Sequence, residues 1–233
     1  VRNRERIEKG YSLKGLNIQG DVDAMLNQID AFDRYLRSSK DDEARNMNLL
    51  FYGPSGTGKS ELARYIGERL KREVLVKRAS DLLSMWVGES EKMIRDAFLE
   101  AEHKESVLVI DEADSLIFGR ERAERSWEIS FTNEFLAQME RFRGIMICTT
   151  NLFSNVDSAS IRRFNHKVGF NYLKPEGVLL FYERFLSPLA KVPLSAPLRD
   201  TLRAISTLAP GDFRVVRDRF VFYDAVNVTD EIL

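Results

Sequence analysis

A glycine-rich loop between an apolar strand and an amphipathic helix constrains this chain more than any other feature. The segment Gly53 to Ser60 reads GPSGTGKS and fits the pattern GxxxxGK[ST] at every position. The preceding run 48–52 has the composition of a short buried strand, and apolar residues recur every fourth position from 62 to 70. This context favours a phosphate-binding loop over a glycine-rich turn that merely links strand to helix. We therefore predict that the chain binds a nucleoside triphosphate.

Each part of the loop has a predicted task. Gly53, Gly56 and Gly58 can take backbone angles that other residues avoid, so successive N–H groups can turn inward around phosphate oxygens at the positive end of the helix. Lys59 would reach the β- and γ-phosphates, and the Ser60 hydroxyl would coordinate Mg²⁺. The residues expected to hold ATP or ADP here are Gly53, Pro54, Ser55, Gly56, Thr57, Gly58, Lys59, Ser60 and Glu61.

Composition narrows the class of protein. The 233 residues include 44% hydrophobic ones, enough for a sizeable core, and 35 Lys and Arg against 36 Asp and Glu give a net charge of −1. This balance carries no global signal for nucleic acid or an anionic membrane, although a local basic patch would be compatible with it. The single cysteine, Cys148, and the absence of a membrane-length apolar stretch or signal peptide favour a cytoplasmic location. A chain that opens on Val1 is consistent with a piece of a longer protein.

Strand and helix patterns alternate along most of the chain. After the loop helix, the sequence predicts strands at 74–76, 107–110, 145–149 and 168–170, and helices from about 89 and at 129–139. This alternation predicts an α/β fold, a P-loop NTPase parallel sheet with helices on both faces. Three helices (176–186, 197–208 and 212–223) then predict a small helical lid subdomain. The expected division is an N-terminal arm and adenine-side segment at 1–47, an α/β subdomain at 48–170 and a lid at 171–233.

Two carboxylates follow the apolar strand at 107–110. Parallel strands end at the sheet edge from which the phosphate loop also emerges, so Asp111 and Glu112 are expected there. Asp111 would hold Mg²⁺, largely through its water shell, and Glu112 would act as the general base for the attacking water. Two acids at a strand end can also be a helix-capping pair. Downstream of a complete phosphate loop, they favour an ATPase that releases ADP and phosphate.

These motifs resemble those of AAA+ ATPases, specifically the classical protein-remodelling group of the valosin-containing, spastin and katanin type. The run 111–114 (DEAD) matches the extended second motif of that group, 147–151 (ICTTN) resembles its sensor-1 strand, and 157–164 (DSASIRRF) resembles its arginine-finger segment. The resemblance implies that Asn151 helps to position the water. It also implies that Arg162 and Arg163 reach the nucleotide of a neighbouring subunit in a homo-oligomeric ring, commonly a hexamer. The alternative for the two arginines is a solvated charge pair.

Two further nucleotide contacts match the family pattern more loosely. The segment 16–20 (LNIQG) would touch adenine through Ile18 and Gly20. In the tail, 211–214 (GDFR) stands where the classical group carries a Gly-Ala pair and many other AAA+ proteins carry a sensor-2 arginine. Arg214 is therefore a candidate phosphate contact, with Arg217 and Arg219 as alternatives.

An aromatic residue in the loop 84–91 bears on what the ATP is used for. In the related ATPases the corresponding loop projects an aromatic-hydrophobic pair into a central pore, and Trp86-Val87 followed by GESE resembles it. A core anchor is the usual role of tryptophan, whereas a pore tryptophan could grip polypeptide without reading its sequence. The resulting hypothesis is a protein-remodelling, unfolding or translocating motor that binds no membrane. Alternatives are a nucleic-acid remodeller or loader, which the neutral charge and Trp86 disfavour, and a slow-turnover assembly switch.

Overall fold

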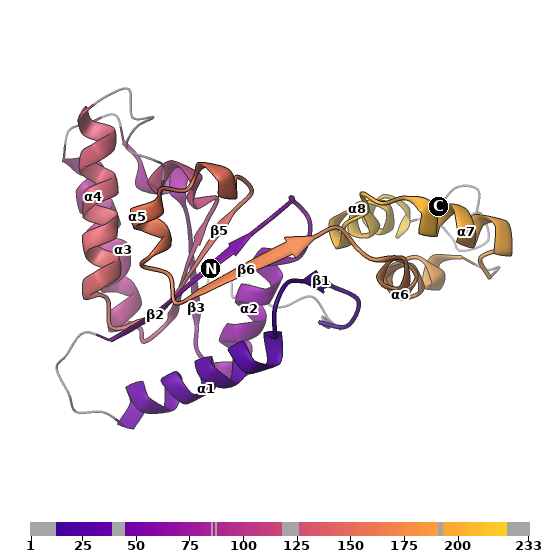
Figure 1. Ribbon diagram of the computed structural model, residues 1–233, viewed down its shortest axis with the longest axis horizontal. Coiled ribbons are helices and arrows are strands. Elements are labelled where there is room, and N and C mark those ends of the chain that lie inside the picture. Colours follow the sequence, from indigo (N-terminus) through magenta and orange to yellow (C-terminus); the bar gives the residue numbers. More distant parts are fainter. Residues whose placement is uncertain are drawn as a thin grey trace. The chain divides into compact units, whose positions relative to one another are not determined.

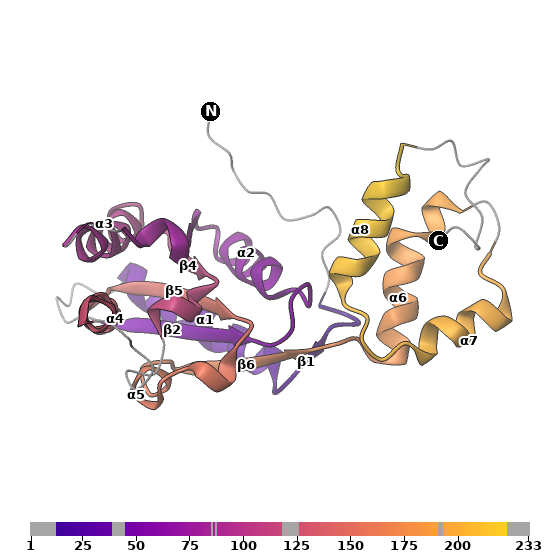
Figure 2. The ribbon, with the colours of Figure 1, turned by 90° about the horizontal axis from the view of Figure 1, so that it is seen from above.

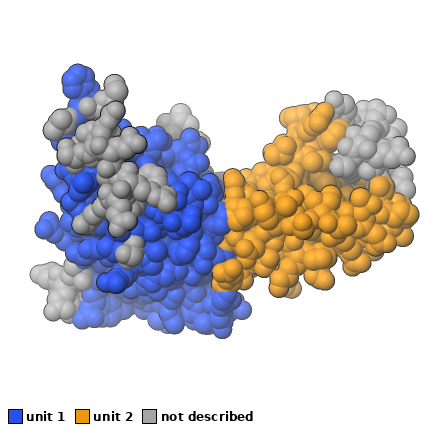
Figure 3. All heavy atoms as spheres, turned by 45° about the horizontal axis from the view of Figure 1, so that its top comes forward, with its two compact units in different colours: residues 1–9, 20–53, 60–169 blue, residues 10–19, 54–59, 170–233 orange. Residues whose placement is uncertain are grey.

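The computed structural model describes residues 13–38, 45–84, 86, 88–117, 126–190 and 193–222. The charged arm expected at 2–9 lies outside these residues. The chain divides into two compact units, coloured separately in Figure 3. Unit 1 contains residues 1–9, 20–53 and 60–169, and unit 2 contains residues 10–19, 54–59 and 170–233. Each unit is described by itself below.

Five parallel strands form the centre of unit 1: β2 (Asn46–Tyr52), β3 (Val74–Arg78), β4 (Val107–Asp111), β5 (Gly144–Thr150) and β6 (His166–Asn171). They lie in the order β6-β2-β5-β4-β3, and β1 (Asn17–Ile18) adds an antiparallel pair at the end of β6. β2 is bordered by β5 and β6, so both of its edges are hydrogen-bonded. The predicted parallel sheet is confirmed.

Helices cover both faces of this sheet, because side chains on both faces are apolar and buried. α3 (Glu89–His103) and α4 (Ser126–Arg141) share a core with Leu50, Leu108 and Met146 of the strands. Within it the ring of Phe98 lies 5.8 Å from that of Phe135. α1 (Val22–Ser38) and α2 (Lys59–Leu70) lie on the other side of the sheet (Figure 1). The predicted helices on both faces are thus confirmed.

The strand register brings polar residues to one edge of the unit 1 sheet. Because Tyr52 pairs with Thr150 and Ile110 with Cys148, the carboxyl ends of β2, β4 and β5 lie together. The chain then turns into short helices: η1 (Ala79–Leu82) after β3, η2 (Ala113–Leu116) after β4, and η4 (Phe153–Asn155) with α5 (Ser158–Ile161) after β5. The carboxyl edge of the sheet is therefore where Asp111 and the other acidic and polar residues selected from the sequence lie.

Unit 2 is a helical body with a short strand pair. It contains α6 (Pro175–Phe185), η5 (Ser187–Leu189), α7 (Ala196–Ala204) and α8 (Pro210–Phe220), drawn in orange to yellow in Figure 2. Its core joins Val178, Phe181 and Phe213, with Leu16 packed against them. Proline opens each of the three α-helices in the first turn, where its missing N–H costs no intrahelical hydrogen bond. The helical region is consistent with the lid that the sequence predicts.

No helix in the described ranges has both the length and the apolar composition required to span a lipid bilayer.

Candidate functional site

The phosphate-loop glycines adopt the conformations for which glycine is needed. Gly53, Gly56 and Gly58 have φ values of 134°, 75° and 103°. An L-residue with a side chain rarely takes such angles, so the loop can make these turns only with glycine. The loop ends where α2 begins, at Lys59, which places the glycines at the positive end of that helix.

The Lys59 ammonium group is held against its own loop. Its Nζ donates to the Pro54 carbonyl oxygen at 2.8 Å, and the Thr57 hydroxyl donates to the same oxygen at 2.7 Å. Carbonyl oxygens are neutral partners for a cation, so a phosphate would be a stronger acceptor for this ammonium. Among the other predicted loop residues, Ser55 is exposed, and Glu61 forms an ion pair with Arg64 at 2.9 Å.

Four residues at the carboxyl edge of the unit 1 sheet form one hydrogen-bonded cluster. Ser60 Oγ donates to Asp111 Oδ1 at 3.1 Å, and Thr149 Oγ1 donates to the same oxygen at 2.5 Å. The backbone N–H of Glu112 donates to Thr149 Oγ1 at 3.1 Å. Sequence reasoning selected Ser60, Asp111 and Glu112 but missed Thr149, which contacts both acidic residues and is 2% exposed.

The Glu112 backbone is left-handed, with φ 54° and ψ 47°. A residue with a side chain takes this conformation at a cost, and such strain is concentrated at functional positions. The Thr149 hydroxyl accepts the Glu112 N–H and so supports this conformation. Thr149 therefore fixes both where the Asp111 carboxylate lies and how the chain leaves it.

The donor set at Ser60 and Asp111 fits Mg²⁺ chemically. A hydroxyl and a carboxylate are hard oxygen ligands, and Mg²⁺ retains several waters beside one or two protein ligands. Within the described residues, no group of three or more His, Cys, Asp or Glu could enclose a metal ion. Ser60 and Asp111 would therefore hold an ion that also depends on water and nucleotide oxygens.

The predicted sensor Asn151 directly follows β5. Its neighbour Thr150 is tied down on two sides: the Thr150 hydroxyl donates to the Asp114 carboxylate and accepts the Leu152 N–H at 3.0 Å. The Thr150 carbonyl accepts the Gly53 N–H at 3.2 Å. Asn151 itself is exposed at the end of this anchored strand.

The two predicted finger arginines differ in their surroundings. Arg163 Nε contacts Glu140 Oε1 at 2.7 Å, and its Nη1 donates to the Ala159 carbonyl at 2.8 Å. Arg162 is exposed, whereas Arg163 is half-buried. The two neighbouring cations therefore have different tasks within unit 1: Arg163 links α5 to α4, and Arg162 faces solvent.

The predicted pore residue Trp86 is 76% exposed, in the loop before α3. A tryptophan that anchored the core would be buried, so the core-anchor alternative is wrong. The loop around it is held from within: Ser84 Oγ donates to the Glu89 carboxylate, and the Ser84 N–H donates to Ser90 Oγ at 2.9 Å. Val87, its predicted companion, lies outside the described residues.

The two residues predicted to contact adenine belong to different units. Ile18 lies in β1 opposite Phe170 in unit 2, and Gly20 belongs to unit 1 with φ 90°. Among the lid arginines, Arg217 is bound to Asp218 at 2.8 Å and lies over the Phe185 ring. Arg217 stays an alternative candidate for the phosphate contact.

Arg219 and Arg214 are the remaining lid candidates. Arg219 lies over the ring of its neighbour Phe220, 5.5 Å from the ring centre. Arg214 is half-buried on α8 and stays the candidate phosphate contact.

The lid and the phosphate loop meet inside unit 2, which the sequence did not predict. The Gly211 N–H, in the first turn of α8, donates to the Gly56 carbonyl at 2.9 Å. A Cβ on Gly211 would lie 3.0 Å from Gly56 Cα, so a residue with a side chain there would have to push the loop aside. Asp212 accepts the Ala209 N–H at 2.8 Å and so fixes the start of α8.

A parallel α/β sheet with a glycine loop before α2 and a Ser60–Asp111 contact defines a P-loop ATPase. A sequence model of the ATPase family associated with various cellular activities (AAA) matches residues 49–172. The chain belongs to the AAA family of ATPases.

Three curated relatives illustrate the similarity. Vacuolar protein sorting-associated protein 4A of Homo sapiens is 36% identical over 127 residues, 52% of this chain and 29% of that protein. Fidgetin-like protein 1 of Drosophila melanogaster is 36% identical over 123 residues, 50% of this chain and 24% of that protein. Spastin of Drosophila persimilis is 31% identical over 171 residues, 70% of this chain and 21% of that protein. The chain therefore spans less than a third of the length of these relatives.

The fold is also that of a solved structure. The crystal structure of the FIGL-1 AAA domain in complex with ADP matches with a TM-score of 0.71 at 23% identity, covering 97% of this chain and 82% of that one. This similarity confirms the AAA fold for the chain.

Proposed function

We propose that this chain is the ATPase module of a motor that remodels, unfolds or translocates polypeptides through the pore of a ring of identical subunits. Its net charge of −1 disfavours a nucleic-acid role. The observation that carries the proposal is the 76% exposure of Trp86 in the loop before α3. A large aromatic surface left in solvent is typical of an interaction site, and it suits a polypeptide because aromatic contact does not require a particular sequence.

The hydrolytic step is assigned to residues of the loop and of the carboxyl edge. Lys59 would exchange its Pro54 carbonyl partner for nucleotide phosphate, a stronger, charge-assisted acceptor. Ser60 and Asp111 would hold Mg²⁺, which supplies charge neutralisation on the phosphates when bound. Glu112 would take a proton from the attacking water, and Asn151 would orient that water. Thr149 keeps the Asp111 carboxylate and the Glu112 backbone in place.

The exposure of Arg162 supports the proposed oligomer. A guanidinium that stabilises charge on the transferred phosphoryl group is needed at the reaction centre. Arg162 is exposed in its own subunit, which favours a role at the nucleotide of a neighbour in a homo-oligomer, commonly a hexamer. The single buried cysteine fits a cytoplasmic location, where thiols stay reduced.

Substitution of Trp86 tests the proposed substrate. Trp86→Ala removes exposed contact area only, so the melting temperature and basal ATPase rate should stay within experimental error of wild type. Unfolding of a fluorescent test protein that carries an unstructured tail should fall at least tenfold. Trp86→Phe, which keeps an aromatic ring, should retain most of that activity. Full substrate unfolding by Trp86→Ala would overturn the assignment of the pore loop.

Two alternatives predict different outcomes. A nucleic-acid remodeller would show ATPase stimulation by single-stranded DNA or RNA, with steep salt dependence. A slow-turnover switch would assemble with ATP and release phosphate only at a marginal rate. Steady-state phosphate release, measured with an unfolded polypeptide and with nucleic acid as additives, separates the three.

A further inference from the structure

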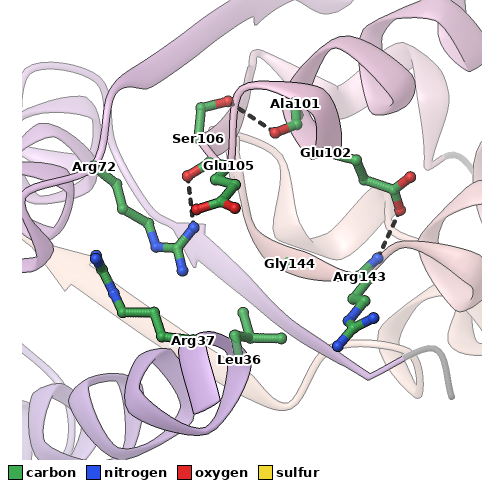
Figure 4. Close-up of a pocket in the computed structure, with 9 residues that line it drawn as sticks. All are labelled: Leu36, Arg37, Arg72, Ala101, Glu102, Glu105, Ser106, Arg143 and Gly144. Atoms are coloured by element: carbon green, nitrogen blue, oxygen red, sulfur yellow. Dashed lines mark hydrogen bonds between the residues drawn. The ribbon is translucent and has the colours of Figure 1, made fainter. Parts of the chain in front are cut away.

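Unit 1 contains a polar cavity of about 500 Å³ at the end of the sheet opposite Asp111. It lies where β4 and β5 begin, next to the ends of α1 and α3, and Figure 4 shows its lining. β4 is five residues long, so the cavity is roughly 13 Å from the Asp111 end of the strand. The cavity is therefore separate from the residues of unit 1 that are predicted to bind and hydrolyse the nucleotide.

One side of the cavity is lined by two arginines that contact the same buried carboxylate. Arg37 Nε contacts Asp33 Oδ2 at 2.8 Å, and Arg72 Nε donates to the other oxygen of the same carboxylate. Asp33 is 6% exposed and the Arg72 side chain 9%, whereas the Arg37 side chain is 49% exposed and remains partly in water. Two guanidinium groups share one carboxylate, which leaves one positive charge to be balanced. Because Arg72 is already paired with Asp33 inside the protein, the partly exposed Arg37 guanidinium is the group that can take an anionic ligand as a charge-assisted partner.

Both arginines have guanidinium N–H groups beyond those that their contacts in the described structure use. Arg37 Nη2 donates to the Leu70 carbonyl at 2.9 Å, and Arg72 Nη1 donates to the Glu105 carbonyl at 2.6 Å. Over the described part of the chain, these contacts and those to Asp33 use two of the five N–H groups of each guanidinium. The remaining N–H groups can bind a carboxylate or phosphate without breaking the internal contacts.

The other side of the cavity has both signs of charge. Glu102 Oε1 accepts the Arg143 backbone N–H at 2.8 Å, and Figure 4 shows these two residues across the cavity from Arg37 and Arg72. The Glu105 side chain also lines the cavity, while Leu36 adds a small apolar surface. A polyphosphate or nucleic acid would meet Glu102 and Glu105 as like charges, which disfavours a polyanion.

We propose that this cavity binds a carboxylate-bearing peptide segment of a protein partner. The carboxylate would lie on the spare N–H groups of Arg37 and Arg72. Backbone N–H groups of the same segment would donate to Glu102 and Glu105, so one ligand satisfies both sides. A volume of about 500 Å³ is in the range of ligand pockets and admits a short peptide stretch. The carboxylate can come from an acidic side chain or from a chain terminus.

The test uses three fluorescein-labelled peptides and fluorescence anisotropy on the whole chain. The first is a C-amidated peptide with one central Glu, the second carries Gln instead, and the third carries Gln with a free C-terminal carboxylate. We expect the Glu peptide to bind at least fivefold more tightly than the amidated Gln peptide, because charge-assisted hydrogen bonds are the stronger ones. Tight binding of the third peptide would identify a terminal carboxylate as the preferred source.

Arg37→Gln is the informative variant, because the Arg37 side chain is 49% exposed and its loss should leave the fold intact. It should weaken the preferred peptide at least fivefold without changing the basal ATPase rate, and the melting temperature should fall only slightly because Asp33 keeps its contact with Arg72. Arg34→Gln, an exposed change on the same helix outside the cavity, should bind like wild type. Equal affinity for all three peptides, or unchanged binding by Arg37→Gln, would overturn the proposal. Inorganic phosphate at millimolar concentration should not displace the peptide, and displacement would reduce the cavity to a simple anion site.

Discussion

At the scale of single residues, Thr149 has the most consequential contacts among the residues that the sequence did not select. Its hydroxyl binds the Asp111 carboxylate and the Glu112 N–H, so its removal frees both acidic residues at once. Thr149→Val, of similar shape, should lower turnover about tenfold and raise the Mg²⁺ concentration needed for half-maximal rate, an effect of the size found when outer-shell partners of metal ligands are lost. Thr149→Ser should restore most of both.

Nucleotide binding measured in EDTA provides the control for Thr149. Since the Thr149 hydroxyl contacts Asp111 and Glu112 and not the phosphate loop in the described structure, Thr149→Val should bind a fluorescent ATP analogue without Mg²⁺ as wild type does. Loss of this metal-free binding would mean that the variant has disturbed the fold instead of positioning Asp111. The sequence could not single out Thr149, because its role depends on the register that places β4 beside β5.

Cys148 allows a second prediction at this scale. It is fully buried in β5, and burial raises the pKa of its thiol far above the ordinary value. The native thiol should therefore resist Ellman's reagent at pH 8 and react only after unfolding. The pKa of the Cys148 thiol is higher in the folded than in the unfolded protein. The contribution of this thiol to folding stability is therefore complete below its unfolded pKa of about 9 and is lost as the pH rises above that value.

The comparison with Cys148→Ala isolates this effect from Lys and Tyr titration. The stability of wild type relative to the variant should be constant below pH 8 and fall above pH 9 by at most about 1.4 kcal/mol per pH unit. Chemical denaturation at several pH values measures the difference. A difference that grows with rising pH would contradict the buried neutral thiol.

At the scale of elements, α8 and the phosphate loop are joined through backbone atoms. Gly211 N–H donates to the Gly56 carbonyl, and a Cβ at position 211 would come within 3.0 Å of Gly56 Cα. Gly211→Ala should therefore shift the loop and weaken ATP binding about three- to tenfold, measured by titration with a fluorescent nucleotide. Val215→Ala, a change at a 69% exposed side chain on the same helix, should leave the affinity unchanged. Wild-type affinity in Gly211→Ala would show that the loop does not depend on this contact.

Local patterns predicted the elements of the sheet well and the short elements poorly. The strands expected at 107–110 and 145–149 are present as β4 and β5, extended by a residue at one or both ends. Continuous apolar runs identify them because both faces are covered. β1 was not predicted, since two residues form a strand only by pairing with the distant β6. α7 ends at Ala204, earlier than the expected 208, because no periodic pattern fixes where a helix stops.

The residues of the candidate site also fall into those that local sequence patterns identify and those that they do not. The loop glycines and Asp111 could be found because their task is encoded in neighbouring residues. The difference between Arg162 and Arg163 could not, because it depends on Glu140, which is distant in sequence and adjacent only in the folded unit. Gly211 and the cavity beside Asp33 likewise arise from contacts between separate elements.

At the scale of the whole molecule, the different surroundings of Arg162 and Arg163 lead to a prediction about how subunits cooperate. Arg163 is engaged with Glu140 and the Ala159 carbonyl, so Arg163→Ala should lower the melting temperature, with a loss of about 1 kcal/mol in stability. Arg162 is exposed, so Arg162→Ala should leave the melting temperature unchanged. If Arg162 completes the site of a neighbouring subunit, the same change should cut ATP turnover by a factor of about 10³ or more, the range typical of arginine fingers.

Mixing decides whether Arg162 acts across the interface. Lys59→Ala subunits keep Arg162 but cannot hold phosphate, and Arg162→Ala subunits can hold ATP but lack the finger, so each is nearly inactive alone. In a mixed ring, an Arg162→Ala subunit next to a Lys59→Ala subunit receives an intact arginine, and turnover should rise well above the sum of the two separate rates. Mixing Lys59→Ala with Lys59→Ala, Arg162→Ala double-variant subunits provides no such pair and should stay inactive. Turnover that only equals the sum of the separate rates would place Arg162 outside the neighbour's site and remove the main argument for a ring.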